Sequence, residues 1–147
     1  TATPRANRDS VQGWRYPAAL YIAQDSPMST SLSTLLDTLN SAPESITFDA
    51  VQAVIAEHYH YTPASFINGE GDDSVRNEAG TNEGSCKVFA FAKLQTLSDA
   101  QTLACFGHFY REHVLGKPDG SDHANIRTFM RHGLSQVVFD TPALAAK

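Results

Sequence analysis

The chain has 147 residues, of which 41% are hydrophobic, and its formal net charge is −5. This size and composition predict one soluble globular domain with a single modest core. No basic stripe is visible that would match nucleic-acid phosphates, and no apolar run approaches the roughly 20 residues needed to cross a bilayer. We therefore expect neither a nucleic-acid partner nor a membrane span.

Two cysteines, Cys86 and Cys105, are too few for the disulfide framework of a small secreted domain. We expect both thiols to be reduced, in the cytoplasm or in the interior of an organelle, and the alternative is a single bridge between them. The sequence contains neither the paired Cys and His pattern of a zinc finger nor a His-Glu-x-x-His helix. We therefore predict no metal site and no cofactor.

Residues 1–27 differ in composition from the rest, because arginine outnumbers acidic residues among Ala, Ser, Thr and Pro. Three interpretations stay open: a natural docking arm, the remnant of a processed leader, and sequence added for expression. Several large apolar side chains in this segment favour an arm that binds a partner or a larger assembly. We expect one domain over residues 28–140 and a C-terminal tail over residues 141–147.

The first half of this domain reads as two helices followed by an extended segment. Leucines recur at helical spacing over residues 29–40, and Pro43 ends that helix. Thr47 is a typical cap for a second helix that we expect to reach residue 59. Residues 59–62 read as an edge strand because Pro63 follows, and the acidic residues 70–76 read as a mobile insert.

The second half reads as three more helices and a short strand. A third helix is expected over residues 85–97, and a capping box at Ser98 opens a fourth that runs to about residue 114. Gly107 would lie inside this fourth helix, where a close crossing by another helix would compensate for its low helix propensity. Asp122 is expected to cap a fifth helix ending at Gly133. Residues 136–140 would then pair with the extended segment 61–67.

These elements predict an α+β, mainly α fold, with about five helices around one core and a small antiparallel β pair. The apolar stripes of three helices should be buried, namely Leu32–Leu39, Phe48–Ile55 and Leu103–Val114.

The segment Asn77–Lys87 is unusually rich in hydrogen-bonding side chains and leads directly into an apolar helix. With three further ordered motifs, it resembles the signature of the HopJ family, named after a type III secretion effector. These motifs are Phe66-Ile67-Asn68-Gly69, then Gln101–Gly107 with Tyr110-Arg111, then Asp122-His123-x-Asn125-Ile126-Arg127-x-Phe129-Met130. The resemblance spans about residues 28–140, implies no established reaction, and implies delivery into a host cell only through the family's name. The chain departs from the family pattern at His113, where an acidic residue is usual, and at Leu134, where Trp is typical.

Cys86 is the first candidate for chemistry, because it lies in the first turn of a predicted helix. Free N–H groups and the positive end of the helix dipole would favour a thiolate there. His123 is the best candidate base, with Asp122 beside it as orienting group and Glu83 as a second base or acid. The alternative is that Cys86 is a small buried residue of the core.

A second candidate is a cluster of polar residues that the motifs share. As ligand-binding residues we select Asn77, Asn82, Glu78, Tyr110, Arg111, Asp122 and Arg127. Buried guanidinium groups need carboxylates, so Glu78 or Glu83 is expected to pair with Arg111 or Arg127. Such a network would either lock the loop structurally or form a pocket for a small polar ligand.

The leading hypothesis is a HopJ-like binding or regulatory module that holds a protein partner or a small polar ligand near the Asn77–Lys87 loop. One alternative is an enzyme or redox protein that uses Cys86 with His123. The other is an accessory subunit docked through residues 1–27. Catalysis is left open, and a non-catalytic role is favoured.

Overall fold

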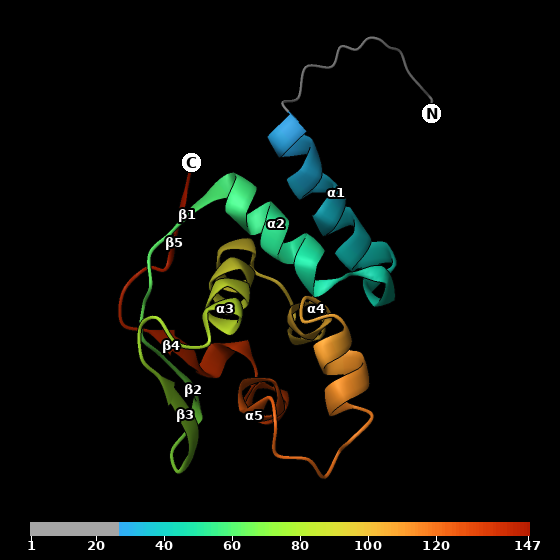
Figure 1. Cartoon of the computed structure of the whole chain (residues 1–147). Helices are drawn as coiled ribbons and strands as arrows, with labels where there is room; N and C mark the ends of the chain where they lie inside the picture. The colour runs from blue at the N-terminus through green and yellow to red at the C-terminus, as the bar shows by residue number, and fades with distance from the viewer. Residues whose placement is uncertain (1–26) are drawn as a thin grey trace. The chain divides into compact units, whose positions relative to one another are not determined.

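The computed structural model describes residues 27–147, with side chains from residue 31 onward (Figure 1). Residues Leu32–Lys147 make up one compact unit, which holds the core and the candidate site. The predicted N-terminal extension and its docking role fall on residues 1–27, which apart from Pro27 lie outside the described residues.

Helical elements and short strands follow one another in groups along the described chain. Its helical elements are α1 (Pro27–Ser41), η2 (Pro43–Ser45), α2 (Phe48–His58), α3 (Glu83–Gln95), α4 (Asp99–Ala104), η3 (Phe109–Val114), α5 (Ala124–His132) and η4 (Leu134–Gln136). Its strands are β1 (Tyr59–Tyr61), β2 (Phe66–Glu70), β3 (Asp73–Asn77), β4 (Val137–Phe139) and β5 (Leu144–Ala146). The α+β, mainly α fold predicted from the sequence is confirmed.

Helix α3 forms the centre of the core, between α2 and the sheet that carries β2 (Figure 1). The ring of Phe89 on α3 contacts Phe66 on β2, Phe106 after α4 and Phe129 on α5, at centroid distances of 5.2–5.8 Å. The middle of α3 is buried on nearly every side, at Cys86 and from Val88 to Ala92, and this part of the helix is apolar, as expected for an enclosed helical segment.

The predicted apolar stripes pack on this core. Leu35, Leu39, Val51 and Ile55 are buried, and Phe48 is partly buried. Thr47 caps α2 by accepting a hydrogen bond from the backbone of Ala50, and Ser98 forms the predicted capping box with Gln101. The capping side chains therefore predicted the starts of these two helices correctly.

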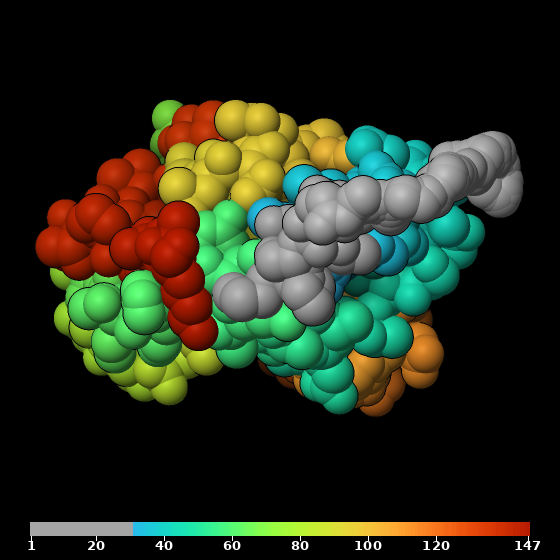
Figure 2. Space-filling model, turned by 90° about the horizontal axis from the view of Figure 1, so that it is seen from above, coloured from blue at the N-terminus to red at the C-terminus, as the bar shows by residue number. Residues whose placement is uncertain are grey.

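The strands form two antiparallel sheets. In the three-stranded sheet the order is β3-β2-β4, so residues 137–139 pair with the extended segment as predicted. The other sheet pairs β1 with β5, and the space-filling view shows the C-terminal residues (red) beside the green residues that include β1 (Figure 2). Strand β5 was not predicted, because its residues 144–146 carry no strand pattern of their own.

Residues 70–76 are not a mobile insert, contrary to the prediction. Gly71, with φ of +60°, turns the chain so that β3 folds back on β2 as a hairpin. The acidic residues misled the prediction because they mark the exposed side of an edge strand, which proteins keep charged to prevent further pairing.

The expected fourth helix is interrupted, also contrary to the prediction. Helix α4 ends at Ala104, and Gly107 adopts φ of +59°, outside the helical region. The chain resumes as the π-helix η3. The predicted close approach at Gly107 is present, because a Cβ atom there would lie 2.7 Å from the backbone nitrogen of Phe48.

Two other helix starts also differ from the prediction. Helix α3 begins at Glu83, two residues earlier than expected. Asp122 does not cap α5: the N-cap residue is His123, and Asp122 instead accepts a 2.8 Å hydrogen bond from Arg127. A nearby guanidinium competes with the backbone N–H groups for a carboxylate, and a charged partner wins.

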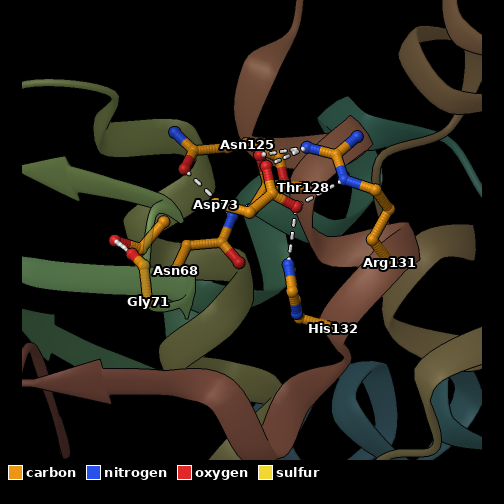
Figure 3. Close-up of polar contacts among 8 residues, drawn as sticks. Asn68, Gly71, Asp73, Asn125, Thr128, Arg131 and His132 are labelled. Atoms are coloured by element: carbon orange, nitrogen blue, oxygen red, sulfur yellow. Dashed lines mark hydrogen bonds and ion pairs between the residues drawn. The ribbon is translucent and has the colours of Figure 1, made fainter.

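The end of α5 is tied to the β2–β3 hairpin by a single carboxylate, that of Asp73 (Figure 3). Arg131 donates two hydrogen bonds to it, of 2.7 and 2.9 Å, and Nε2 of His132 lies 2.7 Å from Oδ2. The hydrogen bonds from Arg131 and then from His132 hold the pKa of Asp73 at about 2, below its ordinary value of 3.8.

We expect Asp73→Asn to lower stability at neutral pH, by an amount that vanishes in acid. A carboxyl with a depressed pKa stabilises the fold above its unfolded pKa, and this contribution is lost as the pH falls through about 4 toward 2. Urea midpoints of wild type and variant, measured from pH 7 to pH 2, should therefore converge at the acid end. A constant difference over the whole range would show that the carboxylate charge is not what ties the hairpin.

Candidate functional site

A pocket of about 380 Å³ opens where the N-terminal ends of α3 and α5 meet, and we call it the α3/α5 pocket. Its lining joins these two helix starts to aromatic side chains from α2 and from the segment around η3. The lining residues are Phe48, Val75, Asn82, Gly84, Ser85, Phe106, Phe109, His123, Ala124, Asn125 and Ile126. Of the residues selected from the sequence, the pocket brings together Asn82 and His123.

Neither helix that opens on the pocket has a side-chain cap. The N-cap residues Asn82 and His123 both adopt left-handed backbone angles, with φ of 48° and 53°. Within the described part of the chain, the backbone N–H groups of Gly84 and Ser85 on α3 and of Ala124 on α5 have no hydrogen-bond partner. Two helix N-termini, each carrying a partial positive charge, therefore face one pocket.

Buried asparagines fix these helix starts to the sheet. Asn68, Asn77 and Asn125 are only 0%, 1% and 7% exposed. The Oδ1 atom of Asn77 accepts hydrogen bonds from Asn82 (2.7 Å) and from Asn125 (2.8 Å), and both of these donors line the pocket. Asn68 on β2 donates to the backbone and side-chain oxygens of Asn125, at 2.8 and 3.1 Å, as seen in Figure 3. The network therefore sets the position of both N-termini relative to each other.

Sequence reasoning selected Asn77 and Asn82 but missed Asn68 and Asn125. Both missed residues stand inside the motifs that carry the family resemblance, which was the available signal. Asn68 was passed over because Asn-Gly typically marks a turn, whereas here it lies within β2.

The rim of the pocket at η3 consists of aromatic rings. The ring of Phe109 lies 5.3 Å from His123 and 5.5 Å from His113, and the ring of Phe48 contacts Phe109 edge-on at 5.1 Å. Nδ1 of His113 lies 3.2 Å from Nε2 of His123. His113 was not selected from the sequence as a site residue.

Cys86 lies in the first turn of α3, as predicted, and both cysteines are free thiols. The expectation of a lowered pKa is wrong: burial raises the pKa of the Cys86 thiol, and it raises that of Cys105 to about 12. The Cys86 sulfur faces the carbonyl of Ala64 at 3.8 Å. Because neutral thiols are weak nucleophiles, this environment does not activate the sulfur.

Cys86 and His123 are not brought together. His123 lines the α3/α5 pocket, Cys86 does not, and no hydrogen bond joins them in the described part of the chain. Glu83 does not line the pocket and accepts a 2.9 Å hydrogen bond from the hydroxyl of Tyr61. Burial and this bond to Glu83 raise the pKa of Tyr61, and the ammonium of Lys87 lies 4.6 Å from its ring centroid.

The predicted pairing of Glu78 or Glu83 with Arg111 or Arg127 is wrong. Glu78 pairs with Arg76 at 3.0 Å, because both lie at the exposed end of β3. Arg127 is satisfied within its own segment, by the backbone and side-chain oxygens of Asp122. In each case the oxygen that the fold brings closest to the guanidinium decided the pair.

Arg111 belongs to a different surface. It donates a 2.6 Å hydrogen bond to the carbonyl of Ile46, and its Nη1 atom is buried without a partner in the described structure. Together with Tyr110 it lines a separate, mainly apolar pocket of about 280 Å³ beside η2 and α4. These two predicted ligand residues therefore lie outside the α3/α5 pocket, and of the seven residues selected as ligand-binding only Asn82 lines it.

Two further structural features concern metal ions and membranes. Among residues 27–147, no group of three or more His, Cys, Asp or Glu side chains is arranged to hold a metal ion. No helix in the same part of the chain is long and apolar enough to cross a membrane.

Comparison with known proteins agrees with this architecture. The family model described as HopJ type III effector protein matches residues 32–144. No curated protein matches this chain. The chain is similar to the crystal structure of VPA0580, a protein of unknown function, with 46% sequence identity and a TM-score of 0.75, over 87% of this chain and all of that one. The family match covers more than half of the chain, and the protein therefore belongs to the HopJ family.

Proposed function

We propose that this protein is a small binding module that holds a small anionic ligand in the α3/α5 pocket. The observation that carries the proposal is the convergence of two uncapped helix N-termini, at Asn82–Ser85 and at His123–Asn125, on one pocket. Free N–H groups and the positive dipole ends at such positions bind phosphate and carboxylate groups.

The walls of the pocket indicate what the rest of the ligand is like. Phe48, Phe106 and Phe109 supply apolar surface, while Asn82 and Ser85 supply polar atoms at one end. A volume of about 380 Å³ lies in the range of pockets for small molecules. The favoured ligand therefore has one anionic group and a compact apolar or aromatic body.

The rigid support of the pocket also favours a binding role. The buried amides of Asn77 and Asn125 hold both helix starts in left-handed conformations that non-glycine residues adopt at an energetic cost. Pre-organised donors of this kind raise affinity because little order has to be created on binding.

The other two hypotheses gain less support. A Cys86/His123 enzyme would need the thiol beside the imidazole, whereas the Cys86 sulfur meets the Ala64 carbonyl and burial raises its pKa. An accessory subunit attached through residues 1–27 rests on a segment outside the described residues. A protein partner and delivery into a host cell remain proposals that rest on the family's description alone.

The test uses inorganic phosphate and benzoate as probes in low-salt buffer. We expect saturable shifts in the amide NMR signals of Gly84, Ser85 and Ala124, with Kd of about 1 mM or tighter for one of the two anions. Ser85→Asp should weaken this binding by at least about tenfold, because its carboxylate occupies the positive end of α3.

The Ser85→Asp variant also separates loss of binding from loss of folding. A carboxylate in the first turn of a helix is usually stabilising, by about 0.3–1 kcal/mol, so the variant should melt no lower than wild type. The matched control Ser85→Ala keeps the backbone N–H groups and should keep anion binding. Absence of saturable shifts with either anion, in wild type and in the control, would refute the proposal.

A further inference from the structure

Four rings gather beside the pocket at η3, from His108, Phe109, His113 and His123, and two of them, Phe109 and His123, line it. The ring of His113 lies 5.3 Å from both His108 and His123, and Phe109 packs against all three histidines. The π-helix η3 brings Phe109 and His113 to the same place, and the left-handed backbone at His123 aims its ring at them. Two separate chain segments are thus joined at the rim by aromatic contacts.

One contact in this cluster depends on protonation. Nδ1 of His113 and Nε2 of His123 lie 3.2 Å apart. A hydrogen bond at this distance needs a protonated nitrogen on one ring and a free lone pair on the other. One added proton is tolerated, because an imidazolium can donate to a neutral imidazole. A second proton places two N–H groups and two positive charges face to face, and the contact cannot survive.

The charged groups around the pair do not remove this conflict. Oδ2 of Asp122 lies 3.8 Å from Nε2 of His123. Arg127 already binds Asp122 and contacts the backbone oxygen of His113, so the carboxylate is largely neutralised. The hydrogen bond from Arg127 lowers the pKa of Asp122, so this carboxylate stays charged between pH 5 and 8. His108 adds a third imidazole beside His113.

We propose that the His113–His123 contact is an acid-sensitive latch on the rim of the α3/α5 pocket. While at least one ring is neutral, the contact holds η3 against the start of α5, and Phe109 stays packed between the rings. When both rings are protonated, His123 and Phe109 separate and the rim opens. Arg127 keeps its bonds to Asp122 and to the 113–118 segment, so the change is confined to the rim.

The latch is a property of the free protein, and only its use in releasing a ligand rests on the proposed function. Its test therefore needs no ligand. Imidazole and amide NMR signals of the full chain are followed from pH 8 to pH 5, the range in which histidine changes charge. We expect the signals of Phe109, His123 and Ala124 to move in two linked steps, and the cross-relaxation between the Phe109 and His123 rings to be lost in the second.

Two substitutions at one position test the mechanism in opposite directions. His113→Gln supplies a neutral partner at every pH, so the second step should disappear and the closed pattern should persist to pH 5. His113→Arg supplies a permanent charge that can still donate to a neutral His123, so protonation of His123 alone should open the rim, in one step instead of two. His60→Gln, at an exposed position on β1, is the matched control. In this variant the signals of Phe109 and His123 should depend on pH as they do in wild type.

The outcomes of these experiments test the latch independently of the proposed binding function. Identical pH dependence at Phe109 and His123 in wild type and His113→Gln would overturn the latch, as would two linked steps in His113→Arg. Phosphate titrated into wild type at pH 8 tests the proposed function alone. If phosphate does not bind at pH 8, the proposed function fails while the two-step pH response of the rim can still be observed. If the second step is missing but phosphate binds, the latch fails and the proposed function stands.

Discussion

Replacing Gly107 with Ala should lower the free energy of unfolding by about 3 kcal/mol or more. The new methyl group would stand 2.7 Å from the backbone nitrogen of Phe48, and φ at this position is +59°. A left-handed conformation costs a non-glycine residue about 1–2 kcal/mol, and overpacking adds about 1–3 kcal/mol. The obstructing atoms are backbone, so no side chain can rotate out of the way. Urea denaturation followed by circular dichroism measures the loss.

Gly71 provides the matched control for Gly107. Its φ is +60°, but nothing lies within 4 Å of the position that a Cβ atom would take. Gly71→Ala should therefore show only the backbone strain, about 1–2 kcal/mol. The difference between the two variants measures the crowding against α2, and equal losses would show that no close approach exists at Gly107.

Replacing Asn125 with Ala should lower the free energy of unfolding by about 3 kcal/mol. The change removes two acceptor contacts of 3.1 Å, from Asn68 and Asn77, and a 2.8 Å donor contact to Asn77. Buried polar groups left unpaired cost about 1–3 kcal/mol each, which exceeds the net gain from a typical hydrogen bond. The partners are 0% and 1% exposed, so water cannot easily replace the missing amide.

The same variant reports on the pocket. Asn77 accepts hydrogen bonds from both Asn82 and Asn125, so losing one partner should disturb the start of α3 as well as that of α5. We expect shifts in the amide signals of Asn82 and Ser85 in addition to the lower urea midpoint. Asn40→Ala, at an exposed position that only accepts from Gln101, should change stability by no more than about 0.5 kcal/mol. Equal effects of the two variants would contradict a structural role for the buried amides.

The sequence predicted well the features that depend on near neighbours in the chain. The caps at Thr47 and Ser98 are present, because a side chain reaches the backbone only three residues ahead. The buried leucines of α1 and the burial of Val51 and Ile55 agree with helical periodicity alone. The pairing of residues 137–139 with β2 was also predictable, since few other extended segments were available to it.

The candidate site was predictable only in part. The richness of the 77–87 segment in polar side chains correctly indicated Asn77 and Asn82, and the family motifs indicated His123. The partners of the charged residues were not predictable, because an arginine binds whichever oxygen the fold brings within reach. Arg111 donates a hydrogen bond to the carbonyl of Ile46, and Arg127 donates one to Asp122, five residues before it in the chain.

Family, fold class and the location of most helices could thus be derived from the order of the residues, because caps and periodicity act within one or two helical turns. The helix breaks and the pocket depend instead on contacts between distant segments. Helix α4 stops at Ala104 because the chain must cross the backbone at Phe48, where only glycine fits. The Cys86 thiol stays neutral because the packing of α3 buries it, whatever the helix dipole favours. The pocket exists because buried amides from β2, β3 and α5 hold two helix starts together, which no local pattern in the chain reveals.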